Sequence, residues 1–178
     1  MERYVDRVQD CLEEIAQAGL MSAFDEAFRV VIGHEGGLVD DPRDAGGLTK
    51  YGISQRQYPG EDIRNLTLER AKELYRRDYW ARVRGDELPF PAALALFDYA
   101  VNSGVETAIR GAQKALNLKV DGILGPITFA AIDNAEPEDF VSALQAERLL
   151  YLARLTSWDT FGRGWARRIV KTAIEAFA

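Results

Sequence analysis

The chain has 178 residues with an apolar fraction of 47%, enough for one compact domain with a substantial core, and this excludes a disordered chain. The net charge of −6 argues against a nucleic-acid partner, because a phosphate backbone would repel the protein. One cysteine, Cys11, excludes an internal disulfide, and one histidine, His34, argues against a histidine-based zinc site. We therefore expect no metal and no cofactor.

The first fourteen residues contain seven charged side chains, so they lack the apolar core of a secretory signal peptide. No apolar run approaches the ~18 residues that would span a bilayer. We therefore expect synthesis in the cytoplasm, no membrane insertion and a separate delivery route for any target outside.

Helical periodicity dominates the sequence and predicts a mainly α protein. Apolar residues recur at steps of three and four from Tyr4 to Ile15, which predicts an N-terminal helix within residues 1–22 that ends near Gly19. Ser22 and Asp25 form a capping-box pattern that starts a second helix, and Glu35 is expected in its last turn.

Later helices are marked by caps and prolines. Thr67 is a candidate cap for a helix that runs to about Trp80, and a last helix is expected after Gly162 and Gly164. Proline suits a first helical turn, where its missing N–H is not needed. Three prolines fit that position: Pro91, Pro126 and Pro137.

Residues 38–53 lack helical periodicity, and their glycines indicate a short hairpin or an irregular lobe. The fold prediction is therefore one lysozyme-like helical domain over residues 1–178, with a small loop or β lobe around residues 36–53. Within it we distinguish the N-terminal helix, a catalytic region at 23–105 and a helical region at 106–178.

The stretch GHEGGLVDDPRDAGGLTKYGIS, from Gly33 to Ser54, contains the candidate catalytic groups. At the end of a helix, Glu35 would face unpaired carbonyls, and burial against neighbouring apolar residues would act in the same direction. Both effects raise a carboxyl pKa and favour a general acid. The alternative is a solvent-facing glutamate at an ordinary helix end.

Asp44 and Thr49 follow in the same loop and could position a water molecule. An inverting glycosidase needs a base and a water on the far face of the sugar, with the two carboxyls roughly 6.5–9.5 Å apart. Asp44 could instead cap a turn before Gly46 and Gly47. The ring of Tyr51 is suited to stacking against a sugar face.

Several motifs together resemble glycoside hydrolase family 108. They are HEGG, DPRDAGG and T-x-x-GIS in the glycine-rich block, then DYW at 78–80, LFDYAVNSG at 96–104 and GWARR at 164–168. The family consists of N-acetylmuramidases that occur as phage endolysins and as secretion-linked muramidases of bacteria. The resemblance covers the chain from Ala23 onward.

The resemblance implies that Glu35 is the catalytic glutamate, with Asp44 and Thr49 as its partners. In LFDYAVNSG, Asp98 and Asn102 lie four residues apart on one helix face, and the resemblance would let both line the cleft. The alternative is that this pair satisfies a neighbouring backbone within a buried helix, and Asn102 is the first choice for a residue that lines the cleft. The usual tyrosine after EGG is Leu38 here, so substrate preference can differ.

Residues 112–132, AQKALNLKVDGILGPITFAAI, resemble a peptidoglycan-binding repeat with its VDG-x-x-GP-x-T core. Asp121 and Gly122 predict a turn, and Pro126 begins the next helix. The alternative is a plain helix-turn-helix corner that contributes little affinity.

The sequence therefore favours a peptidoglycan hydrolase that cleaves the β-1,4 bond between N-acetylmuramic acid and N-acetylglucosamine. Two alternatives stay open: a lytic transglycosylase or chitinase on the same fold, and a peptidoglycan-binding adaptor without activity. The expected partner is the glycan strand, and a holin or a secretion system would deliver the protein to the periplasm or wall.

Charge is unevenly distributed along the chain. Residues 63–84 contain seven basic and three acidic side chains, and residues 163–171 are also basic. Solvated helix faces are the favoured interpretation, and a basic rim that attracts an anionic polymer is the other.

Overall fold

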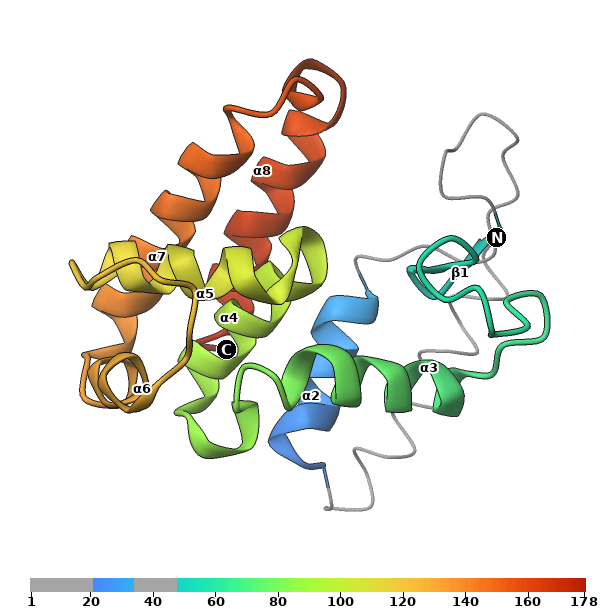
Figure 1. The fold of residues 1–178 in the computed structure, drawn as a ribbon, viewed down its shortest axis with the longest axis horizontal. Coiled ribbons are helices and arrows are strands. Elements are labelled where there is room, and N and C mark those ends of the chain that lie inside the picture. The colour runs from blue at the N-terminus through green and yellow to red at the C-terminus, as the bar shows by residue number, and fades with distance from the viewer. Residues whose placement is uncertain (1–20, 34–47) are drawn as a thin grey trace. The chain divides into compact units, whose positions relative to one another are not determined.

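A computed structural model describes residues 21–33 and 48–178 (Figure 1). These residues fall into two compact units, with the division between Arg76 and Arg77. The mainly α fold class is confirmed. The elements are α2 (Ala23–Ile32), β1 (Thr49–Lys50), β2 (Ile53–Ser54), α3 (Leu68–Tyr75), η1 (Arg76–Trp80), η2 (Gly85–Glu87), α4 (Phe90–Ser103), α5 (Val105–Ala115), α6 (Pro126–Asp133), α7 (Pro137–Leu152) and α8 (Trp158–Glu175). The helix predicted within residues 1–22 lies outside the described residues.

The predicted capping box starts α2. Ser22 Oγ accepts from the Asp25 backbone N–H at 3.2 Å, and the Asp25 carboxylate accepts from the Ser22 backbone N–H at 3.1 Å. The helix ends at Ile32 with Gly33 as its C-cap. Glu35, which the sequence places in the last turn of this helix, lies outside the described residues.

The first unit is held by contacts between α2 and α3. Phe28 and Tyr75 meet edge to face with ring centroids 5.5 Å apart, and Lys72 pairs with Asp25. Thr67 caps α3 as predicted, since its hydroxyl accepts from the Arg70 backbone N–H at 3.1 Å. The helix then widens into the π-helical turn η1, which ends at Trp80 as the sequence suggested.

A two-residue hairpin joins β1 and β2, in agreement with the predicted lobe. Thr49 pairs with Ser54, and Lys50 pairs with Ile53. The turn residues Tyr51 and Gly52 have φ of 53° and 72°. Two successive positive φ values are the signature of a type I′ turn, whose twist matches that of the strands.

The second unit is a helical assembly around α4, which packs against α5, α7 and α8. Figure 1 shows α7 and α8 as an antiparallel hairpin. All three predicted prolines occupy the first turn of their helices. The nine residues of α4 from Ala92 to Ala100 are all buried, so this helix is the centre of the unit.

Two helix boundaries differ from the prediction. α8 begins at Trp158, ahead of both Gly162 and Gly164, because Gly162 lies under the Trp158 indole: a Cβ there would stand 2.6 Å from Trp158 Cδ2. α5 was not predicted as a separate helix. It starts directly after Gly104, whose φ of 91° breaks α4 and lets the chain turn.

Candidate active site

Four of the six predicted site residues are described by the structure, in two separate places. Thr49 and Tyr51 belong to the hairpin of the first unit, whereas Asp98 and Asn102 belong to α4 of the second. Glu35 and Asp44 lie outside the described residues, and so do His34 and Leu38. The catalytic roles of Glu35, Asp44 and Thr49 stay predictions.

The hairpin register sets the direction of the Thr49 side chain. Directly paired residues point to the same face of a sheet, and successive residues point to opposite faces. Ile53 is buried, so its face, shared with Lys50, turns toward the core. Thr49 and Ser54 lie on the other face, and Thr49 is half-buried there.

Tyr51 occupies a turn position that the fold holds in place. Its carbonyl accepts a hydrogen bond from the Tyr75 hydroxyl at 3.0 Å, so α3 anchors the turn. The Lys50 ammonium lies 5.4 Å from the centroid of the Tyr51 ring and also donates to the Arg64 carbonyl at 3.3 Å. The ring is half-buried and retains a surface for stacking.

Asp98 is fully enclosed and bridges three helices. Its Oδ2 accepts from Arg148 of α7 at 2.6 Å and from Thr172 of α8 at 2.9 Å, and its Oδ1 accepts from Arg168 Nε at 2.8 Å. Asp98 and Arg148 both have 0% exposed surface. These contacts give Asp98 a structural role and leave none of its side chain accessible for the substrate contact that the sequence suggested.

The electrostatics of this cluster favour the ionised carboxylate. Burial raises the pKa of Asp98, but the charges of Arg148 and Arg168 outweigh burial and lower that pKa to about 2. Two guanidinium groups face one carboxylate, and Arg148 Nε and Gln145 Nε2 are buried without a hydrogen-bond partner. The cluster is therefore polar, tightly coupled and costly to disturb.

Asn102 lies one turn beyond Asp98, at the end of α4, and is half-buried. Its Oδ1 accepts from Arg148 Nη2 and from Ser103 Oγ, each at 3.3 Å. Among the described residues nothing accepts from its amide nitrogen, so that donor is available to a ligand. Arg148 thus links the core cluster to Asn102, the half-buried member of the pair.

Sequence reasoning missed Arg148, although a signal was present. Along α7 the buried positions Val141, Leu144, Arg148 and Leu152 recur at helical spacing. A charged residue on a core stripe indicates a buried partner. Asp98 is fifty residues away, so no local pattern could identify it.

The VDG segment of the second unit forms a closed network around Gln113. The Gln113 Oε1 accepts from the backbone N–H groups of Asp121 and Gly122, and its Nε2 lies 2.7 Å from Asp121 Oδ1 and 3.1 Å from Thr128 Oγ1. The predicted turn at Asp121 and Gly122 is present, with Gly122 at φ 80°. The motif residues therefore fix the loop to α5 and use their polar groups internally.

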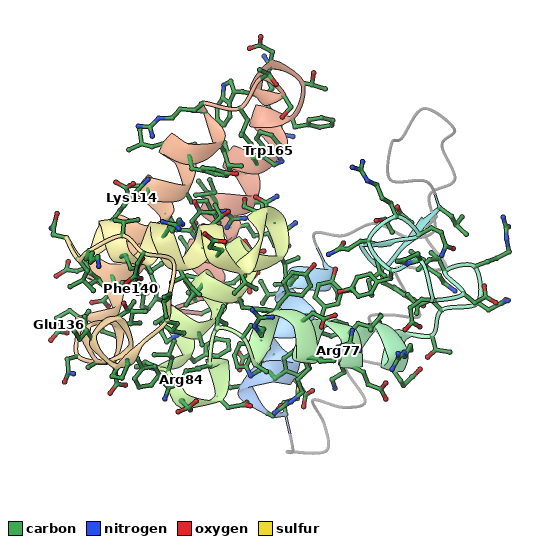
Figure 2. All side chains as sticks on the ribbon, viewed as in Figure 1. Arg77, Arg84, Lys114, Glu136, Phe140 and Trp165 are labelled. Carbon is green, nitrogen blue, oxygen red and sulfur yellow. The ribbon has the colours of Figure 1, made fainter. Side chains whose placement is uncertain are left out.

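The basic stretch of residues 63–84 is largely engaged in surface ion pairs and stacking. Arg70 binds Glu61 at 2.6 Å, and Arg77, labelled in Figure 2, binds Asp78 at 2.7 Å. The Arg84 guanidinium lies 3.7 Å from the centroid of the Phe129 ring. These contacts agree with the interpretation of this stretch as solvated helix faces.

Among the described residues, no three His, Cys, Asp or Glu side chains are grouped so as to hold a metal ion. Within residues 21–33 and 48–178, no helix has the length and hydropathy needed to cross a membrane.

Comparison with known proteins identifies the class. A family model described as "Glycosyl hydrolase 108" matches residues 28–104, and one described as "Predicted Peptidoglycan domain" matches residues 107–170. The structure of Brucella abortus SagA is 34% identical to this chain with a TM-score of 0.79, and the match covers 86% of this chain and 92% of that one. No curated protein matches the sequence.

The two family matches together support a glycoside hydrolase that acts on peptidoglycan. The chain belongs to the glycosyl hydrolase 108 family, as the sequence motifs indicated.

Proposed function

We propose that this hydrolase is an N-acetylmuramidase, a lysozyme that cleaves the β-1,4 bond between N-acetylmuramic acid and N-acetylglucosamine. Glu35 protonates the leaving oxygen, and Asp44 with Thr49 positions the attacking water. The family match over residues 28–104 carries the proposal, because it spans all three residues and the hairpin that holds Thr49.

The described contacts support a role for the hairpin in binding. Thr49 points away from the buried Ile53, and Tyr51 sits in a turn that Tyr75 anchors, so both side chains are held on a rigid element. On α4, Asn102 offers its amide nitrogen while Arg148 fixes its oxygen. We propose that Tyr51 and Asn102 contact the glycan.

The acid is tested by Glu35→Gln, with clearance of peptidoglycan turbidity as the measurement. A general acid contributes about 10²- to 10⁴-fold, so we expect a loss of that size. Glu69→Gln is the matched control, because Glu69 is an exposed glutamate of the first unit with no ion pair among the described residues. A Glu35→Gln variant that is folded and fully active would overturn the assignment.

The bond and the outcome are tested by mass spectrometry of the released muropeptides. Reducing N-acetylmuramic ends are expected for hydrolysis. Anhydro-muramyl ends would instead establish a lytic transglycosylase, in which Asp44→Asn and Thr49→Val would have little effect. Release of soluble sugars from chitin, with peptidoglycan untouched, would establish a chitinase.

We further propose that the protein acts in the periplasm or wall after delivery by a holin, by lysis or by a secretion route. Expression in bacteria tests this delivery step. We expect little lysis until the membrane is permeabilised, and rapid lysis afterwards. Lysis of intact cells at the same rate would contradict it.

A further inference from the structure

The start of α8 presents three aromatic side chains on one face. Trp158, Phe161 and Trp165 are spaced by three and four residues, which places them on one stripe of the helix. The Trp158 and Trp165 rings lie 6.2 Å apart, and the Phe161 and Trp165 rings lie 5.8 Å apart at 35°. We call these three side chains the aromatic ridge; Trp165 is labelled in Figure 2.

The ridge continues the stripe that faces the core. Trp165 lies seven residues before Thr172, and Phe161 lies seven residues before Arg168, so these side chains share the face of α8 that binds Asp98. Arg168 and Thr172 are covered there, whereas Phe161 is 55% exposed. The ridge is therefore the uncovered extension of a core-facing stripe.

Phe161 is exposed and the two tryptophans are half-buried, so the ridge leaves aromatic surface in contact with solvent. Exposed apolar surface that is contiguous in this way is typical of a binding surface. Trp158 packs flat on Gly162, which fixes the first ring, and Trp165 contacts both other rings. Within the part of the chain that the structure describes, Phe161 makes no ring or ion contact other than the one with Trp165. The rings are thus held in place before any ligand arrives.

The ligand is indicated by the segment in which the ridge lies. Residues 107–170 match the peptidoglycan model, so a surface for the glycan is expected within them. The polar groups of the VDG motif are used by Gln113, and Thr128 is buried. Beside that motif, Ile123 and Ile127 are exposed, but aliphatic side chains lack a π face. Aromatic faces attract the polarised C–H groups of a sugar ring.

We propose that the aromatic ridge is a second glycan-binding surface, which stacks against N-acetylated sugar rings of the peptidoglycan strand. The ridge holds the enzyme on the glycan strand through residues other than those proposed to cleave the strand. The proposal needs the peptidoglycan substrate but does not depend on which bond Glu35 cleaves.

The test is binding to purified sacculi by sedimentation, with the full chain carrying Glu35→Gln so that the strands stay intact. Phe161→Ala should raise the dissociation constant about fivefold, and Phe161→Ala with Trp165→Ala more than tenfold. Val170→Ala is the matched control: Val170 is 58% exposed on the opposite face of the same helix, so its binding should stay within twofold of the parent.

A second measurement uses chitotetraose, a soluble N-acetylglucosamine oligomer, and tryptophan fluorescence. Trp158 and Trp165 belong to the ridge and Trp80 is fully buried, so a spectral change on titration reports the ridge. This readout holds even if Glu35→Gln still digests sacculi, an outcome that would count against the proposed acid alone. Phe161→Ala should weaken the titration about fivefold.

Three results would overturn the proposal. The first is that the Phe161→Ala variant binds sacculi and chitotetraose as tightly as the Val170→Ala variant does. Phe161→Ala could convert a dimer to a monomer in analytical ultracentrifugation with glycan binding unchanged, which would make the ridge a self-association surface. It could also abolish binding to anionic phospholipid vesicles while leaving glycan binding intact, which would make the ridge a membrane contact.

Discussion

Replacement of Asp98 by asparagine tests how the second unit is held together. The substitution keeps the shape of the side chain but removes the negative charge that Arg148 and Arg168 face. Arg148 has no exposed surface, so its charge would be left in the core without a counter-charge. A buried ion that loses its partner costs about 3–5 kcal/mol.

The pKa of Asp98 gives an independent figure for the same interaction. A fall from the ordinary value of 3.8 to about 2 corresponds to roughly 2 kcal/mol in favour of the ionised carboxylate in the folded state. Asparagine resembles the protonated form in charge and also loses acceptor capacity for Thr172 and the two arginines. We therefore expect Asp98→Asn to lower the free energy of unfolding by about 2–5 kcal/mol.

Urea unfolding followed by tryptophan fluorescence measures this loss directly. All three tryptophans, at positions 80, 158 and 165, belong to the second unit, so the signal follows that unit alone. Asp133→Asn is the control, because Asp133 is exposed and has no ion pair among the described residues; it should change stability by less than about 0.5 kcal/mol.

A double variant sharpens the test. Addition of Arg148→Met to Asp98→Asn removes the uncompensated charge. The loss of stability in the double variant should therefore be smaller, by at least about 1 kcal/mol, than the sum of the losses in the two single variants. Strict additivity, or a loss below about 1 kcal/mol for Asp98→Asn alone, would refute the reasoning.

Three further outcomes follow from the same unit. The folded pKa of Asp98 lies below its unfolded value, so its contribution to stability is present above about pH 4 and is lost as the pH falls toward 2. The free energy of unfolding should therefore fall more between pH 5 and pH 3 in the parent than in Asp98→Asn. Gly162→Ala should lower the free energy of unfolding by about 1–3 kcal/mol in the same urea assay, because the new Cβ meets the Trp158 indole. Gly164→Ala has open space around the new Cβ and should raise the free energy of unfolding by about 0.5–1 kcal/mol. Gln113→Ala should lose about 2 kcal/mol or more, because its buried amide ties down the VDG loop; a loss below 0.5 kcal/mol would contradict that role.

The helix starts could be predicted because their causes are local. The capping box at Ser22, the cap at Thr67 and the proline first turns each depend on residues within one turn of the helix end. The hairpin glycine is equally local, since a type I′ turn needs positive φ at two adjacent residues.

The errors came from long-range packing. A glycine such as Gly162 is typical of a helix end, but here the absence of a side chain lets the Trp158 ring pack against the backbone of α8. Asp98 and Asn102 were treated as a pair on one helix face, whereas each is bound by Arg148 from another helix. Periodicity gives the face of a helix but not the partner that covers it.

The peptidoglycan segment is not an independent module, and Asp98 is the reason. Residue 98 lies within the stretch that matches the hydrolase family, but Arg148 and Arg168 lie within the stretch that matches the peptidoglycan model. The boundary between compact units falls at Arg76 and Arg77, well before the boundary between the two family matches. A cut between residues 104 and 107 would therefore split one core and separate a buried carboxylate from both of its cations. Because Arg148 also binds the Asn102 oxygen, the segment that matches the peptidoglycan model also shapes the end of the segment that matches the hydrolase family.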